Sequence, residues 1–310
     1  MFHRRLNPFF LLCMTVFILA AGCNADNTQD GPDNTSQRPT PSPTGITYEP
    51  GRNPNGNASP GSPSDHFSLL PPEQTPDLHG GPESENRQPR PLTLAELRQK
   101  YPNVFVLNAP SSKRQVALTF DDAPDDTFTP QILDVLQREG VKATFFVVGN
   151  RAEAHPDIME RIVREGHAVG NHSYNHANLP KLTDEQFREQ IRKTDEIIRR
   201  FTGYTPRMVR PPYGEISEEQ IKWLASQHKT VVNWNVDSLD WKGLTAEQVA
   251  TNVLGHVHPG SIVLMHSGGG IGEDLSGTVN ALPLIIRTLR EAGIEMVTVP
   301  ELLELPPGVS

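Results

Sequence analysis

Residues 115 to 148 read QVALTFDDAPDDTFTPQILDVLQREGVKATFFVV, and this stretch contains a strand, a helix and a strand in succession. Residues 115–120 and 142–148 are short runs of apolar, β-branched and aromatic side chains, which is the pattern of a buried strand. Residues 129–139 place apolar side chains at helical spacing, and Gly140 stands where a left-handed residue commonly ends a helix. The stretch therefore predicts two parallel strands joined by a helix.

The same alternation continues towards the end of the chain. Further candidate strands lie at residues 167–170, 207–210, 230–236, 260–265 and 295–299. Further candidate helices lie at residues 156–165, 184–201, 217–227, 246–257 and 279–292. This order is compatible with an open doubly wound sheet or with a closed barrel. Because about 190 residues is short for eight complete βα units, we expect an α/β fold, a distorted (β/α) barrel of seven parallel strands that forms a single catalytic domain.

Polar side chains collect directly after the predicted strands. The groups are Asp121 and Asp122, His172 and His176, Arg210 to Tyr213, Asp237 to Trp241, and His266. In a parallel barrel the carboxyl ends of the strands converge at one mouth, where active sites are built. We therefore expect these groups to form a single site.

His172 and His176 belong to the sequence HSYNH, in which the imidazoles are four residues apart. On a helical turn this spacing places both rings on one face, close enough to bind one metal ion. With one carboxylate they make three protein ligands and leave a position open, which is typical of catalytic metal sites. We assign Asp122 to the metal and Asp121 to the general base that activates water. The alternatives are surface or core histidines and a plain acidic turn.

Other positions suggest supporting roles. Arg210 could brace the base carboxylate through charge-assisted hydrogen bonds, or it could be a solvated side chain on a loop stiffened by prolines. His266 follows a buried strand and could act as a general acid beside an aspartate, or it could be an ordinary core histidine. Trp241 and Leu264 could line a small apolar pocket.

The start of the chain has the pattern of an export signal. Residues 1–22 combine a basic start, an apolar run and small residues before Cys23, as in a lipoprotein signal peptide. Cleavage before Cys23 would leave this cysteine to carry a lipid anchor; the alternative is an ordinary signal peptide with a chance cysteine. Residues 23–91 are rich in Pro, Gly and Ser, which predicts a disordered tether. The catalytic domain is expected over residues 92–310. The only other cysteine is Cys13, so no disulfide framework is possible in the mature chain.

The chain is acidic, with 37 Asp and Glu against 28 Lys and Arg, and its predicted domain contains no basic run. This balance argues against nucleic acid as a partner. It is compatible with a neutral polymer, and no protein partner is implied.

Five motifs in this order resemble the polysaccharide deacetylases, which are also called carbohydrate esterase family 4 or the NodB-homology domain. The motifs are TFDD at 119–122, H-S-x-x-H at 172–176, R-P-P-Y at 210–213, D-x-x-D-W at 237–241 and L-x-H at 264–266. The resemblance covers residues 115–302. It implies a distorted barrel with one divalent metal ion, usually zinc, with Co, Ni or Mn as alternatives.

The resemblance also implies a role for each matching residue. Asp122, His172 and His176 match the metal ligands, Asp121 matches the catalytic base and His266 the catalytic acid. Arg210 matches the residue that orients the base, and Asp240 the residue that tunes the acid. Trp241 and Leu264 match the lining of the acetyl pocket, and the backbone N–H of Tyr213 matches the oxyanion donor.

Position 123 departs from the family pattern, because it is alanine where the family usually has glycine. Alanine lacks the access of glycine to positive φ. We therefore expect the turn after the two aspartates to be placed differently, with all three metal ligands still present.

Together these features predict a metal-dependent polysaccharide N-deacetylase, which hydrolyses the acetamide of N-acetylglucosamine units and releases acetate. The predicted anchor and tether indicate an extracytoplasmic protein, held to the cell membrane by lipid and facing the cell wall, so peptidoglycan is the favoured N-acetylated glycan. Chitin-like oligomers and poly-N-acetylglucosamine are alternatives, as is an O-acetyl esterase of the xylan type. Two other classes are a catalytically inactive wall-binding lipoprotein and a metallophosphatase, which would need more carboxylate ligands and a second metal.

Overall fold

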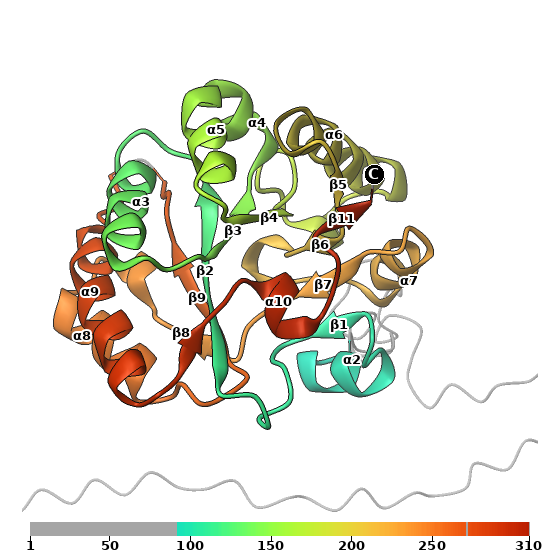
Figure 1. Ribbon diagram of the computed structural model, residues 1–310. Coiled ribbons are helices and arrows are strands. Elements are labelled where there is room, and N and C mark those ends of the chain that lie inside the picture. Colours follow the sequence, from blue (N-terminus) through green and yellow to red (C-terminus); the bar gives the residue numbers. More distant parts are fainter. Residues whose placement is uncertain (1–91, 271, 310) are drawn as a thin grey trace, which may run out of the picture. The chain divides into compact units, whose positions relative to one another are not determined.

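A parallel β-sheet surrounded by helices forms the domain (Figure 1). The computed structural model describes residues 92–270 and 272–309, so the predicted signal peptide, Cys23 and the tether lie outside the described residues. The strand order is β1-β7-β6-β4-β3-β2-β9-β8, and β10 pairs with β2. All pairings in this sheet are parallel. The prediction of an α/β fold with a distorted barrel of parallel strands is confirmed.

The strands of this sheet are β1 Phe105–Val106, β2 Gln115–Ala123, β3 Thr144–Val147, β4 Ala168–Asn171, β6 Met208–Val209, β7 Thr230–Val232, β8 Val236–Asp237, β9 Ile262–His266 and β10 Glu295–Met296. A separate antiparallel pair consists of β5 Thr205–Pro206 and β11 Gly308–Val309. The α-helices are α2 Leu94–Lys100, α3 Phe128–Glu139, α4 Gly149–Ala154, α5 Pro156–Arg164, α6 Asp184–Thr202, α7 Glu218–Ser226, α8 Ala246–Leu254, α9 Ser276–Glu291 and α10 Val299–Leu303. Short 3-10 helices are η2 Leu179–Lys181, η3 Pro212–Gly214 and η4 Asp240–Lys242.

The number of strands differs from the seven predicted, because the described part of this sheet contains nine. The predicted strand 230–236 is divided into β7 and β8. Between them Asn235 uses its side-chain Oδ1 to accept the N–H of Ile262 at 2.9 Å, so a side chain interrupts the backbone ladder. Strand β1 has only two residues, too few for a period of two to be visible in the sequence.

Strand β2 occupies the middle of the core. It lies between β3 and β9 and is buried along almost its whole length. Leu118 and Phe120 are fully buried and belong to the same apolar cluster as Ile132 of α3 and Ile286 of α9. Because slipping a strand by one residue exchanges its faces, this burial fixes the register that brings the following aspartates to the end of the strand.

Local signals determine where the helices begin. Helices α2, α6, α7, α8 and α10 each start with a complete capping box. Helix α3 ends at Gly140, whose φ is 63°. In the described residues we find no helix with the length and apolarity that crossing a membrane requires.

Candidate active site

A cavity of about 390 Å³ opens at the carboxyl ends of β2, β4, β6, β8 and β9. It is lined by Asp121, Asp122, His172, His176, Tyr213, Trp234, Asp237, Trp241, Leu264, His266 and Glu273. Eight of these have a role predicted from the sequence, and Asp237 belongs to a group that was expected at the site without a role of its own. Arg210 and Asp240 do not line the cavity but lie behind it, where each contacts a residue that does. The structure thus brings together every predicted site residue of the described domain.

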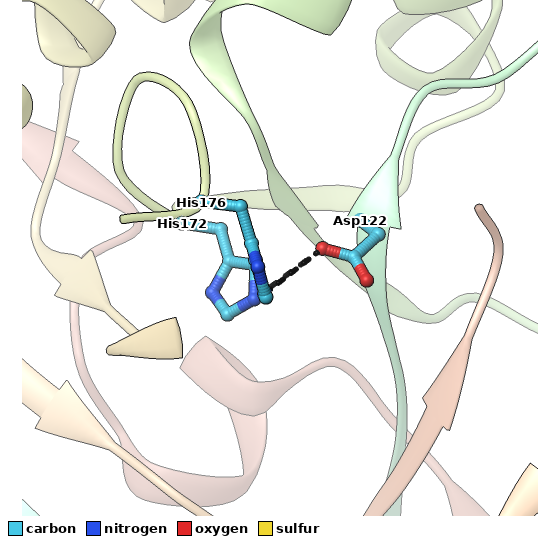
Figure 2. A group of neighbouring side chains, drawn as sticks. All are labelled: Asp122, His172 and His176. Atoms are coloured by element: carbon cyan, nitrogen blue, oxygen red, sulfur yellow. Dashed lines mark ion pairs between the residues drawn. The ribbon is translucent and has the colours of Figure 1, made fainter. Parts of the chain in front are cut away.

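Asp122, His172 and His176 form a group that could hold a metal ion (Figure 2). Their ligand atoms all lie within 4.8 Å of one another. Oδ1 of Asp122 is 3.4 Å from Nε2 of His176 and 3.7 Å from Nε2 of His172. This oxygen is buried and has no hydrogen-bond partner among the described residues. A buried carboxylate oxygen without a partner is costly, and a cation among these three donors would satisfy it.

The surroundings of the two histidines favour binding of a cation through Nε2. Nδ1 of His172 lies 2.7 Å from the carbonyl oxygen of Arg210. Because a carbonyl only accepts, Nδ1 carries the proton and Nε2 keeps its lone pair, which is the usual arrangement in metal-binding histidines. Burial lowers the pKa of His176, which favours the neutral imidazole that binds metals.

Residues 172–176 do not form the helical turn that we predicted. They form an irregular loop, in which Ser173 has φ 66° and His176 has φ 57°. Oδ1 of Asn171 accepts the N–H of Ser173 at 2.9 Å and holds the first part of this loop. The rings of His172 and His176 lie 5.0 Å apart, so the loop achieves the proximity that we had attributed to a helix.

Asp121 is held by a buried arginine. Nη1 of Arg210 donates to Oδ1 of Asp121 at 2.7 Å, and the Arg210 side chain is completely buried. The same guanidinium donates to the hydroxyl of Thr119 and to the carbonyls of Val232 and Asn233. Nitrogen atoms on several sides of the planar guanidinium donate these bonds. The second oxygen, Oδ2, lies 3.6 Å from Nε2 of His172, so it faces the metal ligands.

His266 forms a pair with Asp240. Nδ1 of His266 lies 2.7 Å from Oδ1 of Asp240, and Oδ2 accepts the backbone N–H of His266 at 2.8 Å and the hydroxyl of Thr278 at 2.7 Å. Burial alone would lower the pKa of His266, but the hydrogen bond and charge of Asp240 outweigh it and raise this pKa to about 9. The imidazole is therefore protonated at neutral pH, as a general acid requires.

Aromatic and apolar side chains shape the rest of the cavity. Tyr213 and Trp241 are 63% and 48% exposed, so they stand at its mouth, whereas Leu264 is buried in its wall. Tyr213 has φ 61° and follows two prolines. Since proline has no N–H, the amide of Tyr213 is the first backbone donor after Arg210.

The alanine at position 123 is compatible with the turn. At this turn the residue with positive φ is Asp122, at 63°; Ala123 does not have a positive φ. Ala123 is fully buried at the end of β2, and its carbonyl accepts the N–H of Val148 at 2.9 Å. The left-handed conformation that we attributed to residue 123 is taken by Asp122, so this turn does not require a glycine at position 123.

Three residues at the site were missed in the sequence. Trp234 and Glu273 line the cavity, and Thr278 holds Asp240. Trp234 lies inside the predicted strand 230–236, near its carboxyl end, and that position was a usable signal. Glu273 and Thr278 come from the segment after His266 and the start of α9, where no local pattern indicates which side chains turn towards the site.

The domain is a parallel barrel, and carboxylates and histidines surround one cavity at the ends of its strands. These features define the class of barrel enzymes that includes metal-dependent hydrolases. Residues 108–232 match the polysaccharide deacetylase family. The chain is 48% identical over 206 residues to a peptidoglycan-N-acetylglucosamine deacetylase of Bacillus cereus, a match that covers 66% of this chain and 74% of that relative. The chain belongs to the polysaccharide deacetylase family.

Longer relatives and solved structures agree with this assignment. The peptidoglycan-N-acetylglucosamine deacetylase PgdA of Listeria monocytogenes is 38% identical, over 64% of this chain and only 41% of that protein. The crystal structure of the Bc1960 peptidoglycan N-acetylglucosamine deacetylase has a TM-score of 0.66 at 46% identity and covers 68% of this chain and 98% of its own. BA3943 of Bacillus anthracis, described as a CE4 family pseudoenzyme, has a TM-score of 0.60 at 32% identity and covers 64% of this chain and 68% of its own.

Proposed function

We propose that this protein is a metal-dependent N-deacetylase that removes acetate from N-acetylglucosamine units of peptidoglycan. The observation that carries the proposal is the arrangement of the cavity. An aspartate braced by Arg210 and a protonated histidine braced by Asp240 both face it, beside the group formed by Asp122, His172 and His176. A base, an acid and a candidate metal site around one cavity are the parts that amide hydrolysis needs.

Each residue has a defined task in this reaction. The metal ion would act as a Lewis acid on the acetyl carbonyl and lower the pKa of water. Asp121 takes the proton of the attacking water, while Arg210 keeps its carboxylate in place. The N–H of Tyr213 donates to the carbonyl oxygen as negative charge develops there. His266 gives its proton to the nitrogen of the leaving sugar amine, and Asp240 holds His266 in the protonated form.

Zinc is the proposed metal, with Co, Ni or Mn as alternatives. Two histidines and one carboxylate with an open position are the usual ligands of catalytic zinc. The same nitrogen and oxygen donors also accept the other divalent metals.

Peptidoglycan is the proposed substrate because two relatives named peptidoglycan-N-acetylglucosamine deacetylases match 206 and 203 residues of this chain. The alternatives are chitin-like oligomers, poly-N-acetylglucosamine and O-acetyl esters of the xylan type. Acetate release should be measured from each of these glycans with metal-free protein and with protein reloaded with zinc. Zinc-dependent release from peptidoglycan that exceeds release from the other glycans supports the proposal, and release from acetylated xylan alone contradicts it.

The same experiment addresses the other classes. An inactive wall-binding protein would bind peptidoglycan without releasing acetate, with or without zinc. A phosphatase would hydrolyse a phosphate ester under conditions in which no acetate appears. Retention of the base, the acid and all three metal donors in one cavity favours an active deacetylase over both.

We further propose that the protein is exported and held at the cell membrane through lipid on Cys23, with residues 23–91 as a tether towards the wall. The support is the lipobox-like sequence before Cys23 and the wall polymer named for the relatives. Expression of the full chain and of Cys23→Ala, followed by membrane fractionation, tests this. Loss of membrane association in the variant is the expected result, and equal association would contradict it.

A further inference from the structure

Arg151 of helix α4 joins two parts of the active site through its side chain. Nη1 donates to the carbonyl oxygen of Asp122 at 2.9 Å, and Nη2 donates to the carbonyl oxygen of Gly269 at 2.7 Å. Asp122 carries the candidate ligand carboxylate, and Gly269 lies three residues after His266. One guanidinium therefore connects the end of β2 with the segment that follows the acid histidine.

The Asp122 backbone needs such a restraint. Its φ of 63° is left-handed, a conformation that is uncommon for residues with a Cβ because the Cβ approaches the backbone. Such conformations persist where surrounding contacts enforce them. Two contacts from the segment around α4 act on this turn: the bond of Arg151 to the Asp122 carbonyl and the bond of the Val148 N–H to the Ala123 carbonyl.

Helix α4 also contacts the loop that carries the histidines. The N–H of Gly149 donates to the carbonyl of Ser173 at 3.0 Å, and the N–H of Asn150 donates to the carbonyl of Tyr174 at 2.8 Å. A Cβ at position 149 would lie 2.9 Å from Cδ2 of Tyr174, so this approach requires glycine. The backbone of α4 is thus fixed to the histidine loop, while its arginine is fixed to the aspartate.

The guanidinium of Arg151 is partly buried, and its hydrogen bonds go to these two carbonyls. A Cβ at Gly268 would overlap with both Nη1 of Arg151 and the carbonyl oxygen of Asp122, so the segment after β9 packs directly on the contact. Among the described residues, no carboxylate lies within ion-pair distance of Arg151. Arg151 therefore serves the backbone of the site and not a salt bridge.

We propose that Arg151 is a positioning residue that holds Asp122 in the conformation in which its carboxylate meets His172 and His176, and so sets the affinity for the metal ion. The inference rests on the proposed metal site. Lysine would not replace Arg151, because an ammonium group is a point charge without the planar fork that reaches two carbonyls.

The test compares the full chain with Arg151→Met and Arg151→Lys. Each protein is freed of metal with a chelator, and its zinc affinity is measured by competition with a chromophoric chelator. We expect both variants to bind zinc about 10–100-fold more weakly, the range seen when a supporting contact of a metal site is lost. Arg164→Met is the matched control, because Arg164 is exposed in the neighbouring helix α5 and the change in charge is the same. It should bind zinc as the native chain does.

A second measurement separates positioning from a general loss of structure. In Arg151→Ala, millimolar guanidinium ion should restore zinc affinity in part, because it can occupy the space between the two carbonyls. The same addition should leave the native chain and Arg164→Met unchanged. A variant that was merely less stable would gain nothing from guanidinium.

The outcomes are distinct. Native zinc affinity in Arg151→Met and Arg151→Lys overturns the inference and leaves the proposed function standing. Weaker affinity in Arg151→Ala that guanidinium does not restore also overturns it, since the loss is then structural. If the native chain itself does not bind zinc, the proposed metal-dependent function fails first and the inference fails with it.

Discussion

Nδ1 of His266 lies 2.7 Å from Oδ1 of Asp240, and this hydrogen bond is one of four that the Asp240 carboxylate accepts. The carboxylate also accepts the backbone N–H groups of His266 and Trp241 and the hydroxyl of Thr278. Asp240 is almost fully buried, and its pKa is lowered because these bonds outweigh the effect of burial. An ionised, immobile carboxylate beside His266 therefore keeps a proton on the histidine.

The first prediction concerns the titration of His266. Its pKa is raised from an ordinary 6.5 to about 9, so this pair stabilises the fold fully below pH 6.5 and progressively less as pH rises through about 9. In Asp240→Asn the supporting charge is gone, burial dominates, and the pKa should fall to 6.5 or below. An NMR titration of the histidine ring in metal-free protein measures this shift. The alkaline limb of deacetylation should move in the same direction, and an unchanged His266 titration would refute the pairing.

The second prediction concerns the base. Asp121→Asn should lower turnover by about 10²–10⁴-fold, the usual contribution of a general base. Zinc affinity should stay near that of the native chain, because Asp121 is outside the ligand group. Acetate release and zinc content measure the two effects. Asp126→Asn, an exposed carboxylate in the following turn, is the control and should retain full turnover. Retained acetate release from Asp121→Asn would remove Asp121 from its role.

The third prediction concerns the metal donors. Chelation should abolish acetate release, and added zinc should restore it. His176→Ala should lose both zinc and activity but remain folded, because the side chain is 29% exposed and lies in a loop. His256→Ala removes an exposed histidine outside the cavity and should behave as the native chain. Stoichiometric zinc in purified His176→Ala would exclude this histidine as a ligand.

The fourth prediction concerns acid stability and a histidine away from the site. His167 is buried, and its Nδ1 accepts the N–H of Ala143 at 3.1 Å. Burial, with the charges of Lys142 and Arg161, lowers its pKa to about 4. Between pH 6.5 and about 4 the unfolded chain binds a proton that the native chain does not, so the free energy of unfolding falls as pH falls, by about 3 kcal/mol in all.

Urea unfolding of the native chain and of His167→Gln at pH 7 and pH 5 checks this prediction. Glutamine can still accept the Ala143 N–H but does not titrate, so the variant should lose less stability on acidification. Equal losses in the two proteins would show that His167 does not control acid stability.

The alternation of strands and helices was predictable because it depends on local patterns. The burial of β2, β3, β4 and β9 appears in the sequence as apolar runs, and the capping boxes mark the helix starts within a few residues. Strand β1 and the division between β7 and β8 were not predictable, because two-residue strands exist only through their neighbours.

Most of the residues that meet at the cavity could be named from the sequence, because parallel strands deliver the residues at their carboxyl ends to one mouth. Trp234, Glu273 and Thr278 were found in the structure alone. How the side chains at the cavity are oriented towards one another depends on contacts between distant segments of the chain. Asp121 and Asp122 are adjacent and chemically identical, yet one pairs with Arg210 and the other faces His176. That difference comes from the left-handed turn at Asp122 and the contacts of Arg151 and Arg210. The contact of Arg210 with Asp121 was predicted, whereas the turn and the Arg151 contacts depend on segments far apart in the chain and leave no local pattern.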